Sequence, residues 1–134
     1  MSKDKIRALV TYRLEQAAEA VAAAKLLLDA GMCRQAAGRA YYAMFYAVLA
    51  LFASRGLGSS RHSGALALFD REFVKNGPFA RQHSWSLHEL FDLRQRADYR
   101  EMFSVSAERA ESAIASAEAF LAEARGYLGQ QPGL

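Results

Sequence analysis

Residues 40–53 read AYYAMFYAVLALFA, and these fourteen residues place no charge on any face of a helix. A helix without a polar face must be covered on most of its sides, by its own chain or by a partner. The stretch is shorter than the run of about 20 apolar residues that crosses a bilayer, so we expect no membrane span. We predict a central core helix over about residues 34–54, which a second subunit could share.

The composition indicates one helical domain. Among 134 residues there are five Val, two Ile and one Thr, so intrinsic preference favours helix and excludes an all-β fold. A hydrophobic fraction of 52% excludes a disordered chain. We predict an all-α fold, an antiparallel bundle of four to five helices. We expect a single domain over residues 1–128 and a frayed tail over residues 129–134.

Periodic apolar residues define the helices before and after the central one. The first is predicted over about residues 6–28. The third is predicted to begin at a cap formed by Ser59 or Ser60 and to stop at the Asn-Gly-Pro sequence of residues 76–78.

Two more helices follow the Asn-Gly-Pro sequence. Ser86 and Glu89 have the spacing of a capping box, which predicts the start of a short fourth helix that fades near Tyr99. The last helix follows Ser106 and continues to about Leu128.

The charge balance points to phosphate-bearing partners. The formal net charge is +3, and 13 of the 17 basic residues are Arg, whose planar fork suits phosphate and carboxylate. Arg residues spread over solvated helix faces explain the same numbers equally well. The single cysteine, Cys33, allows no internal disulfide, and the N-terminus has no apolar signal run, so we expect a cytoplasmic protein.

Several chemistries have no support in the sequence. A di-iron bundle needs Glu-x-x-His pairs, and none of the three histidines has Glu three positions before it. The chain has no P-loop, no Cys pair with zinc spacing and no dinucleotide-binding glycine motif. His88 and Asp92 lie four residues apart but would supply only two metal ligands. We therefore expect neither a metal nor a cofactor.

The densest polar cluster is LRQRADYR at residues 93–100. Arg94 and Asp98 lie four residues apart and border the apolar face of their helix, so with the Tyr99 phenol they could clamp a phosphate. The alternative is an ion pair within the helix that fastens it to its neighbour. Arg96 and Arg61 are further candidates for binding RNA or a nucleotide.

Four segments in this order resemble the HEPN (higher eukaryotes and prokaryotes nucleotide-binding) domain. The resemblance covers about residues 6–128 and is strongest to the small stand-alone prokaryotic branch, often encoded beside a minimal nucleotidyltransferase. The segments are RAYYAMFYAVLALF at 39–52, RHSG at 61–64, FDREFVKNG at 69–77 and RQRADY at 94–99.

The resemblance implies a homodimeric helical bundle in which the motifs of two copies face one cleft. Many members cut RNA there with an Arg followed four to six residues later by His. In some toxin pairs the partner nucleotidyltransferase silences the HEPN protein by transferring AMP to a nearby Tyr. Here Arg94 takes the place of the motif Arg, and Tyr99 is the candidate for modification. The motif His is missing, and Asp98 and Tyr99 stand in that region instead.

His62 is a candidate general acid or base, because it lies near the start of the third predicted helix. The leading hypothesis is an RNA-directed protein of a toxin–antitoxin-like nucleotidyltransferase pair, acting as a metal-independent endoribonuclease. Arg94 would steady the transition state, and Asp98, Tyr99 or His62 would move protons. The first alternative is a non-catalytic dimer that binds a nucleotide or docks on the nucleotidyltransferase. The second is a helical module that only makes protein contacts.

Overall fold

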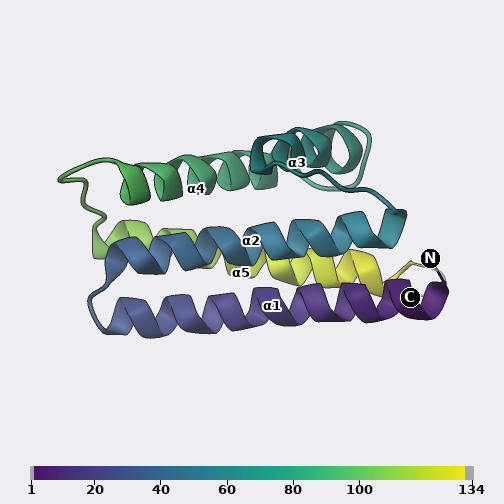
Figure 1. Ribbon diagram of the computed structural model, residues 1–134, viewed down its shortest axis with the longest axis horizontal. Helices are drawn as coiled ribbons and strands as arrows, with labels where there is room; N and C mark the ends of the chain where they lie inside the picture. Colours follow the sequence, from purple (N-terminus) through teal and green to yellow (C-terminus); the bar gives the residue numbers. More distant parts are fainter. Residues whose placement is uncertain (1, 132–134) are drawn as a thin grey trace.

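The computed structural model describes residues 2–131, which contain helices and no strand (Figure 1). This confirms the predicted all-α fold with five helices. Residues 132–134 of the predicted tail lie outside the described residues, and Gly129 still belongs to the last helix. The elements are α1 (Lys3–Asp29), α2 (Cys33–Arg55), α3 (His62–Phe69), the π-helix η1 (Asp70–Lys75), α4 (Arg81–Tyr99) and α5 (Ala107–Gly129).

The helices are arranged around α2. It packs against α1, α4 and α5, and the short α3 lies beside α4 at the end of α2 (Figure 1). The chain runs in opposite directions along α1 and α2, and again along α4 and α5. The α3–η1 unit turns the chain back before α4, so α2 and α5 run in the same direction. The bundle is thus antiparallel between successive long helices and parallel in the α2–α5 pair.

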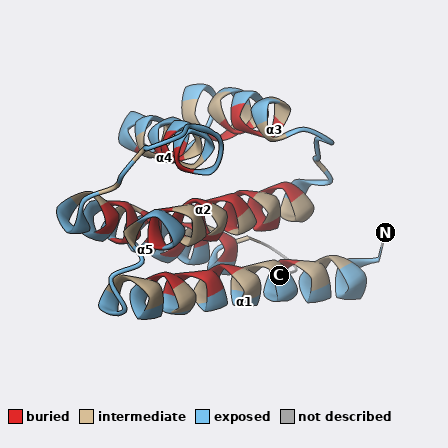
Figure 2. Cartoon of the chain, turned by 60° about the vertical axis from the view of Figure 1, so that its left-hand side comes forward, coloured by how far each residue is buried: buried red, intermediate tan, exposed pale blue. Residues whose placement is uncertain are grey.

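The helix α2 is the predicted core helix. Twelve of its residues are buried and six of these are Ala, which lets neighbouring helices approach its backbone (Figure 2). The full helix of 23 residues is long and apolar enough to pass for a membrane span, although its uncharged stretch alone is not. However, 67% of the most apolar 18-residue segment of this helix is buried inside the bundle, as in the core helix of a soluble protein.

The predicted start of the fourth helix at Ser86 is wrong. The helix α4 begins at Arg81, and its first turn is held by tertiary contacts that a capping motif does not reveal. His83 is buried, lies 5.4 Å from Phe120 between ring centroids, and its Nε2 contacts a carboxylate oxygen of Glu123 on α5. Packing on α5 therefore extends the helix beyond the start that local sequence indicates.

The serine cap predicted for the third helix is also absent. Arg61 occupies the N-cap position of α3 and makes no side-chain capping bond. The Ser59 hydroxyl instead donates to the Arg61 carbonyl oxygen at 3.2 Å and accepts from the Arg61 amide at 3.4 Å. Serine thus shapes the turn before the helix, a bonding pattern that competes with capping. By contrast, Ser106 does cap α5, accepting from the Arg109 amide at 3.1 Å.

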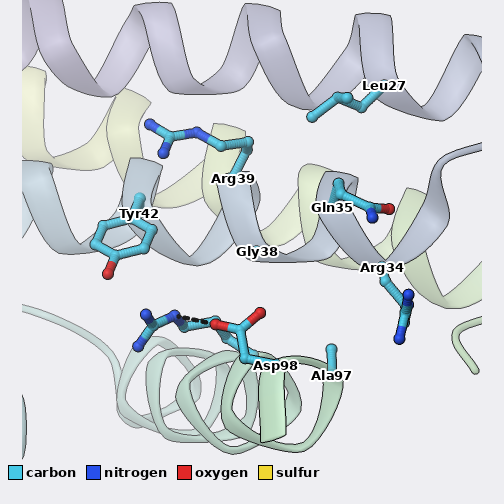
Figure 3. A pocket seen from close by; sticks show the side chains of 9 residues that line it. Leu27, Arg34, Gln35, Gly38, Arg39, Tyr42, Ala97 and Asp98 are labelled. Carbon is cyan, nitrogen blue, oxygen red and sulfur yellow. Dashed lines mark ion pairs between the residues drawn. The ribbon is translucent and has the colours of Figure 1, made fainter. Parts of the chain in front are cut away.

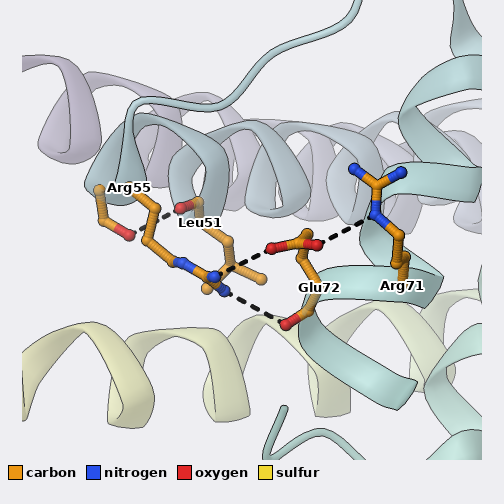
Figure 4. Close-up of polar contacts among 5 residues, drawn as sticks. Leu51, Arg55, Arg71 and Glu72 are labelled. Atoms are coloured by element: carbon orange, nitrogen blue, oxygen red, sulfur yellow. Dashed lines mark hydrogen bonds and ion pairs between the residues drawn. The ribbon is translucent and has the colours of Figure 1, made fainter. Parts of the chain in front are cut away.

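The π-helix η1 is tied to α2 through Arg55 (Figure 4). Its guanidinium donates to the Glu72 carbonyl oxygen at 3.2 Å and to Glu72 Oε1 at 3.1 Å. The same group lies 4.7 Å from the centroid of the Phe73 ring. Arg71 holds the other carboxylate oxygen of Glu72 at 3.0 Å. These contacts fix the wide π turns, which α-helical hydrogen bonds alone would not favour.

Gly77 allows the chain to turn back against η1. A Cβ at this position would lie 2.7 Å from both the Cα and the carbonyl oxygen of Phe73. That carbonyl also accepts a hydrogen bond from the Phe79 amide at 2.9 Å. Because backbone atoms crowd the position, a larger residue must displace the turn.

We expect Gly77→Ala to lower the free energy of unfolding by about 1–3 kcal/mol, because the added methyl group overpacks the turn. Gly126→Ala is the matched control, since its Cβ would meet nothing within 4 Å inside α5. It should leave stability unchanged or raise it by about 0.5–1 kcal/mol. Chemical denaturation of the three proteins measures both effects, and equal stability of Gly77→Ala and wild type would contradict the crowding.

Candidate functional site

A hollow of about 570 Å³ lies between the N-terminal half of α2, the end of α1 and α4 (Figure 3). Gly38 keeps one wall open, because the nearest atom to a Cβ placed there would be Arg94 Cγ at 4.0 Å. Three arginines from two helices face the space. The lining residues are Leu27, Arg34, Gln35, Gly38, Arg39, Tyr42, Arg94, Ala97 and Asp98.

The ring of Tyr42 holds two of these arginines. The Arg39 guanidinium carbon lies 5.3 Å from the ring centroid and that of Arg94 lies 5.0 Å from it. Cation–π contacts of this kind orient a guanidinium without neutralising it. Arg94 Nε also contacts Asp98 Oδ2 at 3.1 Å, and the Arg94 side chain is only 20% exposed. A partly desolvated Arg of fixed orientation can bind an anion through its remaining donors.

The hollow is positively charged overall. Arg34, Arg39 and Arg94 line it against a single carboxylate, that of Asp98. Asp98 is half-exposed, so part of its charge is screened by water. The hollow is therefore suited to phosphate or carboxylate groups.

His62 lies beside this hollow and is held by a buried tyrosine. Tyr41 is fully buried, and its hydroxyl lies 2.7 Å from His62 Nδ1. The imidazole stacks on Phe45 with ring centroids 4.2 Å apart and an angle of 3° between the planes. It also meets the Tyr42 ring at 5.9 Å between centroids. His62 and Arg94 thus contact the same tyrosine ring.

The protonation state of the Tyr41–His62 pair follows from burial. Burial raises the pKa of Tyr41 above its ordinary range, so the phenol stays protonated. Burial, and then the charge of Arg94, lower the pKa of His62, so the imidazole is neutral at pH 7. A buried hydroxyl needs an acceptor, and we assign that role to Nδ1. The proton of neutral His62 is then on Nε2.

The structure brings together only part of the set of residues predicted from the sequence. Arg94 and Asp98 line the hollow, and His62 lies next to it against Tyr42. Tyr99 is 77% exposed at the end of α4, outside the lining.

Two predicted binding residues also lie outside the lining. Arg96 forms an ion pair with Asp92 at 3.0 Å. Arg61 is exposed at the N-cap of α3.

Three lining residues of α2 lie outside the set predicted from the sequence. Arg34, Arg39 and Tyr42 were not predicted as site residues, although they join Gln35 and Gly38 along one side of the hollow. Gln35, Arg39 and Tyr42 follow one another at spacings of four and three, which places them on one face of a helix. This polar strip ahead of the uncharged stretch was the available signal.

The metal alternative gains no support. His88 Nε2 contacts Asp70 Oδ2 at 2.6 Å, so its partner lies on η1 and is not Asp92. Within residues 2–131, no three His, Cys, Asp or Glu side chains gather closely enough to hold a metal ion.

Comparison with known proteins matches residues 10–127 to the family model described as the HEPN domain. A Thermotoga maritima protein named "UPF0332 protein" is 40% identical over 113 residues, which is 84% of this chain and 86% of the relative. Two Methanocaldococcus jannaschii proteins carry the name "Putative toxin". One is 34% identical, covering 90% of this chain and 89% of its own length. The other is 30% identical, covering 86% and 78%.

We expect the His62 imidazole to titrate below 6.5 in an NMR pH series, because burial and Arg94 both disfavour its charged form. Arg94→Gln should move the midpoint upward, since it removes the nearby positive charge. Arg96→Gln is the control on the same helix and should leave the midpoint in place. A midpoint unmoved by Arg94→Gln would show that the two groups do not interact.

The same shift predicts a pH dependence of stability. As the pH is lowered below 6.5, the unfolded chain protonates His62 before the folded protein does. The unfolded state then binds more protons, so the free energy of unfolding decreases as the pH decreases. The loss should continue down to the folded pKa of His62. The variant His62→Asn should show a shallower decline over this range in denaturation curves. Parallel curves for the two proteins would contradict the assignment.

Proposed function

The chain belongs to the HEPN domain family, and on that premise we propose that it is the RNA-directed, toxin-like member of a pair with a minimal nucleotidyltransferase. The toxin names of its relatives support a toxin-like role. We further infer that it acts in the cytoplasm as a homodimer, as the family resemblance implies, with the Arg94 motifs of two copies at one cleft.

The observation that carries the proposal is the cationic hollow. Arg34, Arg39 and Arg94 line one space, and Tyr42 orients two of them. Guanidinium groups bind phosphate oxygens through paired N–H donors. Several guanidinium groups together are better suited to a ligand with many negative charges than to a ligand with one carboxylate. An RNA backbone supplies such phosphates in series.

Metal-independent cleavage of RNA fits this arrangement. The ribose 2′-hydroxyl loses its proton and its oxygen attacks the adjacent phosphorus. The bond to the 5′ oxygen breaks, that oxygen takes up a proton from water, and a 2′,3′-cyclic phosphate remains. Arg94 would stabilise the charge that builds on the phosphorane oxygens. Asp98 is the one carboxylate in the lining described above, so it is the candidate to accept the 2′-hydroxyl proton. His62, with its proton on Nε2, would donate a hydrogen bond to the phosphate.

A second candidate function is a non-catalytic accessory that binds a nucleotide or docks on the nucleotidyltransferase. Two observations favour it. Arg94 is already engaged by Asp98 and Tyr42, and no histidine belongs to the lining of the hollow. Anion binding needs only the arginines, whereas cleavage also needs a group that moves protons.

We expect purified protein to cleave bulk tRNA or messenger RNA without added metal, and Arg94→Ala to reduce the rate about 100- to 1,000-fold, the usual cost of removing a transition-state donor. Arg125→Ala is the control, because it removes one exposed guanidinium of α5 that lies outside the hollow. Gel analysis of end-labelled RNA measures the rates, and circular dichroism checks the folding of each variant.

The outcomes separate the two candidates. Equal cleavage by wild type and Arg94→Ala would indicate a contaminant or another site. No cleavage by any form, combined with RNA or nucleotide binding that Arg94→Ala weakens, would favour the accessory. A monomer at micromolar concentration would contradict a cleft built from two copies.

We expect Tyr99 to gain the mass of one AMP when the protein is incubated with its partner nucleotidyltransferase and ATP. Its phenol lies on a side chain that is 77% exposed, so a partner enzyme can reach it. Tyr99→Phe should abolish the mass shift in intact-protein mass spectrometry. Tyr12→Phe is the control, because Tyr12 is also exposed but lies on α1. Modification that persists in Tyr99→Phe would place it elsewhere.

A further inference from the structure

A second hollow of about 620 Å³ lies on the other side of α4, between that helix, η1 and the loop that joins them. Its volume falls in the range of small-molecule sites. Trp85 and Arg94 are nine residues apart, which is about 180° around a helix. The two hollows therefore occupy opposite faces of α4. The second hollow is lined by Asp70, Val74, Lys75, Phe79, Arg81, Ser84 and Trp85.

The indole of Trp85 is the first unusual feature of this hollow. Trp85 is the only tryptophan in the chain, and it is 65% exposed. A large flat ring gains most when it is covered, and most tryptophans in proteins are largely buried. An exposed indole at the edge of a concavity presents a face on which another planar group can stack.

Two cations flank the same space. Lys75 and Arg81 are both exposed, and in the described part of the chain neither forms an ion pair. Some exposed cations elsewhere are paired, as Lys25 is with Glu118 and Arg109 with Glu89, and others, such as Arg125, are not paired within residues 2–131. Positive charge is therefore free at this hollow.

The one carboxylate in the lining is already occupied. Asp70 Oδ1 accepts from the Ser84 hydroxyl at 2.6 Å, and Asp70 Oδ2 contacts His88 Nε2 at 2.6 Å. These contacts fix η1 to α4 and turn both carboxylate oxygens toward partners. Asp70 thus serves the wall of the hollow, and Lys75 and Arg81 set its outward charge.

We propose that this hollow is a nucleoside-phosphate subsite, in which a base stacks on Trp85 and its phosphate contacts Lys75 and Arg81. An aromatic face beside free cations is the combination that binds unpaired nucleotides without sequence preference. An acidic peptide would use the cations and leave the indole unused. The subsite lies apart from the Arg94 hollow and does not depend on cleavage there.

Trp85 also supplies the readout. As the sole tryptophan, it reports stacking directly through quenching of its fluorescence. The probes are AMP, a short oligodeoxyadenylate that cannot be cleaved because it lacks the 2′-hydroxyl, and ribose 5-phosphate. We expect saturable quenching by AMP and the oligonucleotide and none by ribose 5-phosphate. Equal affinity for AMP and the oligonucleotide identifies a free nucleotide as the ligand, and tighter binding of the oligonucleotide identifies a strand.

Variants test each part of the subsite by anisotropy of a labelled oligodeoxyadenylate, in an Arg94→Ala background. Trp85→Leu should weaken binding about 5- to 150-fold, and Trp85→Phe should restore much of it, because a flat ring is kept. Lys75→Gln and Arg81→Gln should each reduce the salt dependence of log K by about 0.7. Arg125→Gln, on an exposed position of α5, is the charge control and should change neither quantity.

Several outcomes would overturn the proposal. Absence of quenching by both AMP and the oligonucleotide excludes stacking on Trp85. If ribose 5-phosphate binds as tightly as AMP, the phosphate alone accounts for the affinity and the base does not stack on Trp85. Loss of quenching in the Arg94→Ala variant assigns the signal to the other hollow. Retained quenching in that variant with loss of RNA cleavage supports both sites, and retained quenching without cleavage by wild type supports this one alone.

Discussion

Burial of the uncharged stretch of α2, residues 40–53, is the constraint on which the rest of the structure depends. Ala40, Ala43, Ala47 and Ala50 are fully buried along α2, so neighbouring helices can pack close to its backbone. Neither α1 nor α5 alone could cover all sides, and α4 is needed for the remaining one. The hydrophobic effect therefore sets the positions of three helices at once, because each covers part of one apolar cylinder.

The same burial creates the candidate site. Tyr41 is carried into the core with its hydroxyl, and a buried hydroxyl without a partner is costly. His62 at the start of α3 supplies that partner. Tyr42, one position along, is only partly buried and offers its ring to Arg39 and Arg94. Two adjacent tyrosines on a core helix thus connect α3 to the arginine cluster, and packing alone brings His62 and Arg94 to one ring.

Hydrophobic periodicity was sufficient to predict the helices and the central role of α2, because the spacing of apolar residues shows which face of a helix is buried. It failed at the start of α4, where the contacts of His83 with Phe120 and Glu123 come from a distant part of the chain. Arg94 and Asp98 could be predicted as a pair from their spacing. Arg34 and Arg39 could not be assigned to them, because that requires knowing which face of α2 meets α4.

All three histidines have partners within the fold, which bears on the proposed reaction. His62 is held by Tyr41, His83 by Glu123 and His88 by Asp70, so each has a structural partner. In the proposed reaction the proton acceptor is then Asp98, whose carboxylate pairs with Arg94 before RNA binds. A phosphate that draws the Arg94 guanidinium toward itself weakens that pair. The released carboxylate becomes a better base at the moment the phosphate is in place, so one ion pair couples binding to proton transfer.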